Sequence, residues 1–172
     1  MDKYILLTKP RSRSYWLSKF LTYKDCKVEH DFSLYCSSIK ELISTMPTAI
    51  VDTGLVIKWE ELLPFKNNII LIERENGPII SSCKKLGLEL NSFFWNGIES
   101  FEKAKKHFEV IPYSDLETKE TCRYLFEKIT KYSFDIAHWN YFKEKNIQKD
   151  ISAFQQEARK YLKNIELLYG YN

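Results

Sequence analysis

The sequence predicts an α/β fold, in which a mainly parallel sheet of about five strands is flanked by helices on both faces. Short apolar runs alternate with longer amphipathic runs as far as residue 111, and this alternation is typical of parallel sheets. The opening run Tyr4-Ile5-Leu6-Leu7 has no polar alternation, as expected for a strand buried on both faces. We therefore expect one domain over residues 1–172, with an α/β core of about 1–116 and a helical C-terminal portion of about 117–172.

The predicted strands are short runs rich in apolar residues, each bounded by polar residues, Gly or Pro. We expect them at residues 4–8, 27–30, 48–52, 68–73 and 108–111.

The intervening segments carry helix signals. Trp16, Leu17 and Phe20 share one helical face. Ser38 and Glu41 have the spacing of a capping box, and Pro78 suits the first position of a helix. The helices are expected at residues 14–21, 38–44, 57–63, 78–86, 91–107, 118–131, 134–145 and 152–169.

Composition excludes several classes of protein. The aromatic content of 15% argues against disorder, and the net charge of +3 suits an anionic ligand without requiring nucleic acid. The four cysteines are scattered, so neither a disulfide framework nor a zinc site is expected. Because the apolar runs are too short for a signal peptide or a membrane span, we expect a cytoplasmic protein.

The segment Lys9-Pro10-Arg11-Ser12-Arg13-Ser14-Tyr15 lies between the first predicted strand and the first predicted helix. It offers basic side chains, hydroxyl groups and the backbone N–H groups of a helix N-terminus, which together favour an anion. The G-x-x-x-x-G-K-[ST] pattern is missing from this segment, which disfavours a nucleotide-cleaving P-loop.

A second candidate anion site follows the fourth predicted strand. Arg74 stands at the end of that strand, and Ser82 follows eight residues later, near the start of the next helix. Parallel strands place their carboxyl ends at one edge of the sheet, so both candidate sites should lie at that edge. Two anion sites there predict a ligand with two separated phosphate groups.

Both segments resemble the cofactor motifs of sulfotransferases that use 3′-phosphoadenosine 5′-phosphosulfate (PAPS). The first family motif is roughly Pro-(Lys/Arg)-Ser-Gly-(Thr/Ser)-Thr-Trp-Leu, and residues 10–17 read Pro-Arg-Ser-Arg-Ser-Tyr-Trp-Leu. The second is a strand ending in Arg with Ser eight residues later, as at Arg74 and Ser82. Tyr113-Ser114-Asp115-Leu116 is similar to the family's Tyr-Glu-Asp-Leu. The resemblance covers residues 4–125 and suggests a short bacterial or phage-type member.

The resemblance implies a P-loop-like core that transfers a sulfuryl group from PAPS to a hydroxyl or amine of a small-molecule acceptor, leaving 3′-phosphoadenosine 5′-phosphate (PAP). It requires no metal. Lys9, Arg11 and the loop from Ser12 through Arg13 and Ser14 to Tyr15 would hold the 5′-phosphate, with Arg11 also stabilising the leaving group. Arg74 and Ser82 would hold the 3′-phosphate.

Glu29 is the expected catalytic base, and two other residues are alternatives to it. Glu29 resembles the glutamate that several branches of the family carry soon after the first helix. The cytosolic branch uses a histidine after the third strand, but Asp52-Thr53-Gly54 stands there in this chain. His30 and Asp52 are therefore the alternatives to Glu29.

Arg13 departs from the family pattern, because it stands where the motif has Gly. If the loop needs a positive φ there, Arg13 must adopt a strained conformation. This departure and the short chain favour an alternative, a non-catalytic nucleotide-binding module that retains the fold. A P-loop kinase and a nucleic-acid binder are weaker alternatives.

Overall fold

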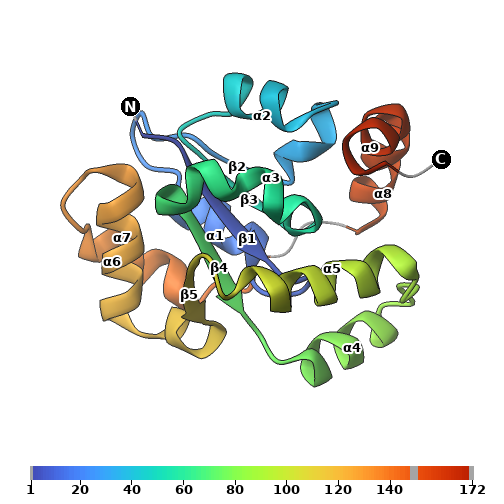
Figure 1. Ribbon diagram of the computed structural model, residues 1–172. Coiled ribbons are helices and arrows are strands. Elements are labelled where there is room, and N and C mark those ends of the chain that lie inside the picture. The colour runs from blue at the N-terminus through green and yellow to red at the C-terminus, as the bar shows by residue number, and fades with distance from the viewer. Residues whose placement is uncertain (1, 148–150, 171–172) are drawn as a thin grey trace.

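In the computed structural model, which describes residues 2–147 and 151–170, strands β1 to β5 form a parallel sheet of order β2-β3-β1-β4-β5. β1 is central: Leu6 pairs with Val51 of β3 on one side and with Ile70 of β4 on the other. Figure 1 shows the sheet at the centre of the molecule with helices on both sides. The predicted α/β class with a parallel sheet is confirmed.

The strands lie close to their predicted places. They are β1 (Tyr4–Thr8), β2 (Val28–His30), β3 (Ala49–Asp52), β4 (Ile69–Glu73) and β5 (Glu109–Pro112). The α-helices of the described residues are α1 (Ser14–Leu21), α2 (Ile39–Thr45), α3 (Trp59–Leu62), α4 (Asn76–Lys85), α5 (Ser92–Ala104), α6 (Lys119–Thr130), α7 (Ile136–Lys143), α8 (Ile151–Lys160) and α9 (Leu162–Tyr169).

The side chains of β1 alternate between two hydrophobic layers. Tyr4 and Leu6 pack in a cluster with α1 and α6, whereas Ile5 and Leu7 pack in a cluster with α2, α5 and α9. All five residues of β1 are buried, which explains why this strand reads as a continuous apolar run. Since both faces of the sheet are covered, the strand ends are the places where polar side chains can gather.

Several helix boundaries differ from the prediction for local reasons. The single helix expected at 57–63 is instead a 3₁₀ turn (Leu55–Lys58), α3 and a second 3₁₀ stretch (Leu63–Asn68). Pro64 lacks the N–H that would continue the α-helical pattern, so the chain tightens into 3₁₀ geometry. Helix α4 begins at Asn76, and Pro78 therefore lies within its first turn rather than at its first position.

The helix expected at 152–169 is divided at Tyr161, whose φ of −113° and ψ of 19° are not helical. The Tyr161 ring makes an edge contact with Tyr35, with ring centroids 4.8 Å apart. A tertiary contact thus accompanies a break that the helical period of the sequence does not signal.

Every helix within the described residues is too short or too polar to cross a bilayer.

Candidate active site

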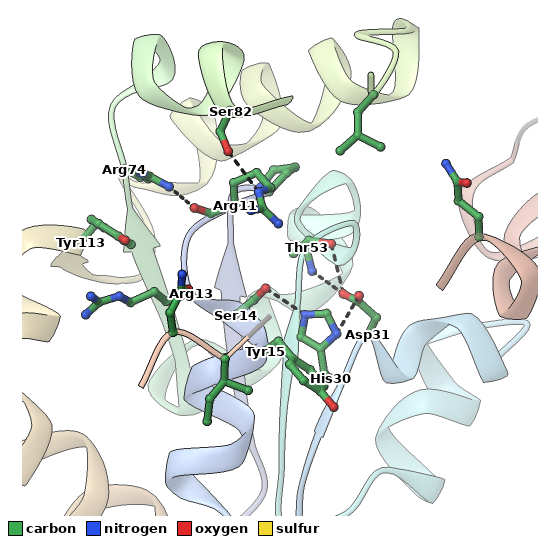
Figure 2. Close-up of a pocket in the computed structure, with 15 residues that line it drawn as sticks. Arg11, Arg13, Ser14, Tyr15, His30, Asp31, Thr53, Arg74, Ser82 and Tyr113 are labelled. Atoms are coloured by element: carbon green, nitrogen blue, oxygen red, sulfur yellow. Dashed lines mark hydrogen bonds and ion pairs between the residues drawn. The ribbon is translucent and has the colours of Figure 1, made fainter. Parts of the chain in front are cut away.

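A cavity of about 630 Å³ opens at the carboxyl ends of the strands. Its walls come from the segment after β1, from the ends of β2 and β3, and from Arg74 after β4. The chain crosses from β3 on one side of β1 to β4 on the other, and open α/β sheets bind ligands at such a switch point. Figure 2 shows the lining side chains converging on this space.

Strained backbone is concentrated at this cavity. Five non-glycine residues of the described chain have a positive φ, and Arg11 (62°), Arg13 (57°) and Asp31 (52°) line the cavity. The left-handed conformation costs a non-glycine residue about 1–2 kcal/mol, and such strain clusters at ligand-binding sites. The loop does require a positive φ at position 13, the condition under which strain was expected there: Arg13 adopts at the N-cap of α1 the conformation that Gly adopts without strain.

The two predicted anion sites are joined through Arg11. Its Nε donates to Ser82 Oγ over 3.2 Å. Nη1 of Arg74 in turn contacts the carbonyl oxygen of Arg11, and the Arg74 guanidinium lies 4.4 Å from the centre of the Tyr113 ring. Arg11, Arg74 and Ser82 therefore form one basic cluster, visible in the upper part of Figure 2, rather than two separated groups.

Arg13 lies apart from this cluster, below it in Figure 2. Its guanidinium is 3.4 Å from Glu117 and 5.8 Å from the centres of the Trp16 and Tyr113 rings. The Arg13–Glu117 pair is exposed, so it contributes little to stability and leaves Arg13 able to turn toward an anion.

A series of polar side-chain contacts in the cavity joins Ser14, at the start of α1, to the end of β2. Ser14 Oγ lies 2.8 Å from Nε2 of His30, and Nδ1 of His30 lies 2.9 Å from Oδ2 of Asp31. The second contact is close in distance, but its geometry is not that of a hydrogen bond. Edge contact with the Tyr15 ring, 5.4 Å away, also holds the imidazole in place.

Two buried carboxylates behind His30 order the loops around them. Asp31 Oδ1 accepts hydrogen bonds from the backbone N–H and the hydroxyl of Thr53, over 3.2 and 3.1 Å. Asp52 accepts from the backbone N–H groups of Ser33, Gly54 and Leu55. Burial, and after it the negative charge of Asp31, raises the pKa of the Asp52 carboxyl. Asp52 therefore serves as a cap for these loops and does not line the large cavity.

The structure separates Glu29 and Lys9 from the cavity. Glu29 is exposed on the edge strand β2, alternates with His30, and is not among the lining residues. The Lys9 ammonium is buried and donates to Glu102 and to Asn76, each over 2.9 Å. Because its ammonium group is bound to these two side chains, Lys9 stabilises the first loop from inside the protein and not as a ligand contact.

Ser12 is fully buried, and its hydroxyl has no hydrogen-bond partner within the described residues. It lies beneath the first loop and does not line the cavity. Its side chain is therefore not placed to contact a ligand in the cavity.

The cavity includes residues that the sequence prediction did not assign. Asp31 and Thr53 follow the ends of β2 and β3, and Tyr113 follows β5. The rule that ligands bind beyond strand ends could have indicated all three. Asn146, Ile147 and Gln155 come from the helical C-terminal portion, and no motif marked them.

Comparison with models of known protein families, with curated proteins and with solved structures finds no match to this chain.

The placement of Lys9 leads to a first prediction. Burial raises the pKa of the Glu102 carboxyl, but hydrogen bonds from Lys105 and Lys9 outweigh it and lower that pKa overall. Glu102 therefore remains charged at neutral pH, and Lys9→Met should lower the free energy of unfolding at pH 7 by about 1–3 kcal/mol, measured by urea titration. The loss should shrink once acid protonates Glu102, because the stability from a lowered carboxyl pKa disappears as the pH falls through it.

Lys9→Met should also leave the affinity for adenosine 3′,5′-bisphosphate within about threefold, whereas Arg11→Met should reduce it at least about tenfold, the size of one charged hydrogen bond. A comparable loss of affinity in both variants would return Lys9 to the ligand site.

Proposed function

We propose that this protein is a sulfotransferase-like enzyme that transfers a sulfuryl group from PAPS to a hydroxyl of a small-molecule acceptor. One observation carries the proposal: a strained, basic first loop, Arg74 with Ser82, and an imidazole all face a single cavity at the switch point of a parallel sheet. These are the three parts that such a transfer requires, namely two anion anchors and a base.

The charges of the cavity favour an anionic ligand. Among the described residues that line it, Arg11, Arg13 and Arg74 face one carboxylate, that of Asp31, which lies beside His30. The volume of about 630 Å³ is within the range of pockets that hold nucleotide-sized ligands. Bound PAPS would supply the sulfuryl group; Arg13, Ser14 and the α1 N-terminus would hold its 5′-phosphate end, and Arg11, Arg74 and Ser82 its 3′-phosphate.

His30 is the residue best placed to act as the base. It lines the cavity, and its Nε2 already lies 2.8 Å from a hydroxyl group, that of Ser14. Asp31 lies against the other ring nitrogen and would stabilise the imidazolium that forms when Nε2 takes the acceptor's proton. When Ser14 turns its hydroxyl to a phosphate oxygen, Nε2 becomes free to receive that proton.

A second candidate function rests on the same contact. A serine, a histidine and an aspartate in series are also the arrangement of an acyl-transfer enzyme. Ser14 Oγ would attack an ester carbonyl while its proton passes to His30 Nε2 and then to the leaving alkoxide. Water would complete the hydrolysis of the acyl-serine by the same route. The misaligned His30–Asp31 contact makes this the weaker candidate.

The choice of ligand tests the proposed function. Adenosine 3′,5′-bisphosphate at about 100 times its dissociation constant should stabilise the protein by about 2.7 kcal/mol without Mg²⁺, seen as a rise in melting temperature. Arg74→Ala should weaken this ligand about ten- to a hundredfold and AMP far less. Arg123→Ala is the matched control, because Arg123 is exposed and lies over Phe134, away from the cavity.

Equal losses for both nucleotides in Arg74→Ala would mean that Arg74 acts through its contact with the Arg11 carbonyl. A larger stabilisation by ATP that depends on Mg²⁺ would support a kinase instead.

The assignment of the base leads to a third prediction. His30→Gln should lower the conversion of PAPS to PAP, measured with a mixed panel of alcohols, phenols and amines, by about 10²–10⁴-fold. Glu29→Gln, one residue away on the same strand, should leave turnover within about twofold. The reverse order of effects would restore Glu29 as the base. Binding of the bisphosphate without turnover in any variant would support the non-catalytic module.

The second candidate function has its own test. If Ser14 is a nucleophile, a fluorophosphonate probe should label the intact protein at Ser14, as located by peptide mass spectrometry. His30→Gln should slow that labelling at least about 100-fold, the usual contribution of a general base. Ser18, which donates to the Tyr15 carbonyl on the same helix, provides the control variant Ser18→Ala. Absence of labelling at Ser14 would eliminate the acyl-transfer candidate.

A further inference from the structure

A second, smaller cavity of about 240 Å³ adjoins the large one. It lies in front of the end of β3, between Phe93 at the start of α5 and Ile165 and Tyr169 of α9. Asp31 and Thr53 line both cavities. A molecule in the smaller cavity would therefore reach the space in front of His30 across these two residues.

The surface of the smaller cavity is almost wholly apolar. The polar groups around it already have partners: the Tyr169 hydroxyl lies 3.0 Å from Ser33 Oγ, and Asp52 accepts backbone hydrogen bonds. Burial, and next the negative charge of Asp52, raises the pKa of Tyr169 well above its ordinary value, so the phenol is neutral. The cavity thus favours burial of an uncharged apolar group.

The size of the cavity limits that group. A dry apolar cavity of about 150 Å³ is enough to bind benzene, and this one has a volume of about 240 Å³. It can hold one six-membered ring with a short substituent. Two buried carboxylates, Asp31 and Asp52, lie at its wall and oppose a ligand that carries a negative charge.

We propose that this cavity is the acceptor subsite, and that it takes a small uncharged alcohol with a single apolar ring. The ring packs against the Phe93 and Tyr169 side chains, whose own rings touch edge to face with centroids 5.3 Å apart. The hydroxyl lies at the boundary formed by Asp31 and Thr53, on the side of His30. The transfer step rests on the proposed sulfotransferase function, whereas binding of the ring does not.

Gly54 makes the cavity directly testable. Its φ of −97° is open to any L-residue, so alanine there brings no backbone strain. A Cβ at Gly54 would lie 3.0 Å from the Tyr169 hydroxyl oxygen and 3.2 Å from Cζ of Phe93, so the added methyl group takes up cavity volume beside both rings. At Gly77 in α4 a Cβ meets no atom of the described residues within 4 Å, so Gly77→Ala is the matched control.

The experiment measures binding of benzyl alcohol and benzoate to the full chain by NMR titration, with no nucleotide present. Benzyl alcohol should bind at least about tenfold more tightly than benzoate. Gly54→Ala should weaken benzyl alcohol by about tenfold, and Gly77→Ala should leave it within twofold. Ile165→Ala enlarges the cavity and should shift preference toward 1-naphthalenemethanol, which keeps the test informative if Gly54→Ala folds poorly.

Benzoate binding as tightly as benzyl alcohol would overturn the proposal, as would equal effects of the two glycine substitutions. Addition of PAPS separates the inference from the function on which it rests. If the alcohol binds as expected and is not sulfated, the subsite stands and the sulfotransferase proposal fails. If other hydroxyl compounds are sulfated while benzyl alcohol neither binds nor reacts, the sulfotransferase proposal stands and the acceptor subsite is wrong.

Discussion

The burial of the parallel sheet on both faces is the constraint on which the rest of this structure depends. Within the described residues, the two hydrophobic layers use alternate side chains of β1 and its neighbours, so polar side chains accumulate at the strand ends. Because the strands are parallel, the ends of β1, β2, β3 and β4 all lie at one edge. The candidate active site is a consequence of that geometry: segments far apart in sequence deliver one or two polar residues each to the same cavity.

Contacts of charged side chains stabilise the strained backbone of the first loop. Arg11 and Arg13 both have left-handed backbone conformations, which L-residues adopt at a cost. Two contacts hold the loop in that shape: Arg74 contacts the Arg11 carbonyl, and Arg11 donates to Ser82. Lys9 supports it from below through Glu102 and Asn76. Arginine at position 13 therefore provides a charge in a conformation that glycine adopts without strain.

Buried carboxylates link His30, the proposed base, to the neighbouring loops. Asp31 contacts His30 on one side and Thr53 on the other, while Asp52 caps the turn that contains Gly54. Removing such charges from water is costly unless they are hydrogen-bonded, and here backbone N–H groups supply most of the bonds. The same loops form the wall between the large cavity and the apolar one, so the position of His30 and the shape of the smaller cavity depend on a shared set of contacts.

The sequence by itself determined the class of fold and the approximate strands, because these follow from local periodicity. It also showed that Arg13 would be strained if the loop needed a positive φ there, and the structure supplies that positive φ. It also identified Arg11, Arg13, Ser14, Tyr15, His30, Arg74 and Ser82, all of which line the cavity. Only the tertiary structure decided that His30 lines the cavity while Glu29 does not. It also decided that Lys9 bonds to Glu102 and Asn76 inside the protein, and that α9 forms part of the wall of a second cavity. The physical reason is that a side chain's direction at a strand end, and the partner that a buried charge finds, depend on residues distant in sequence that pack against it.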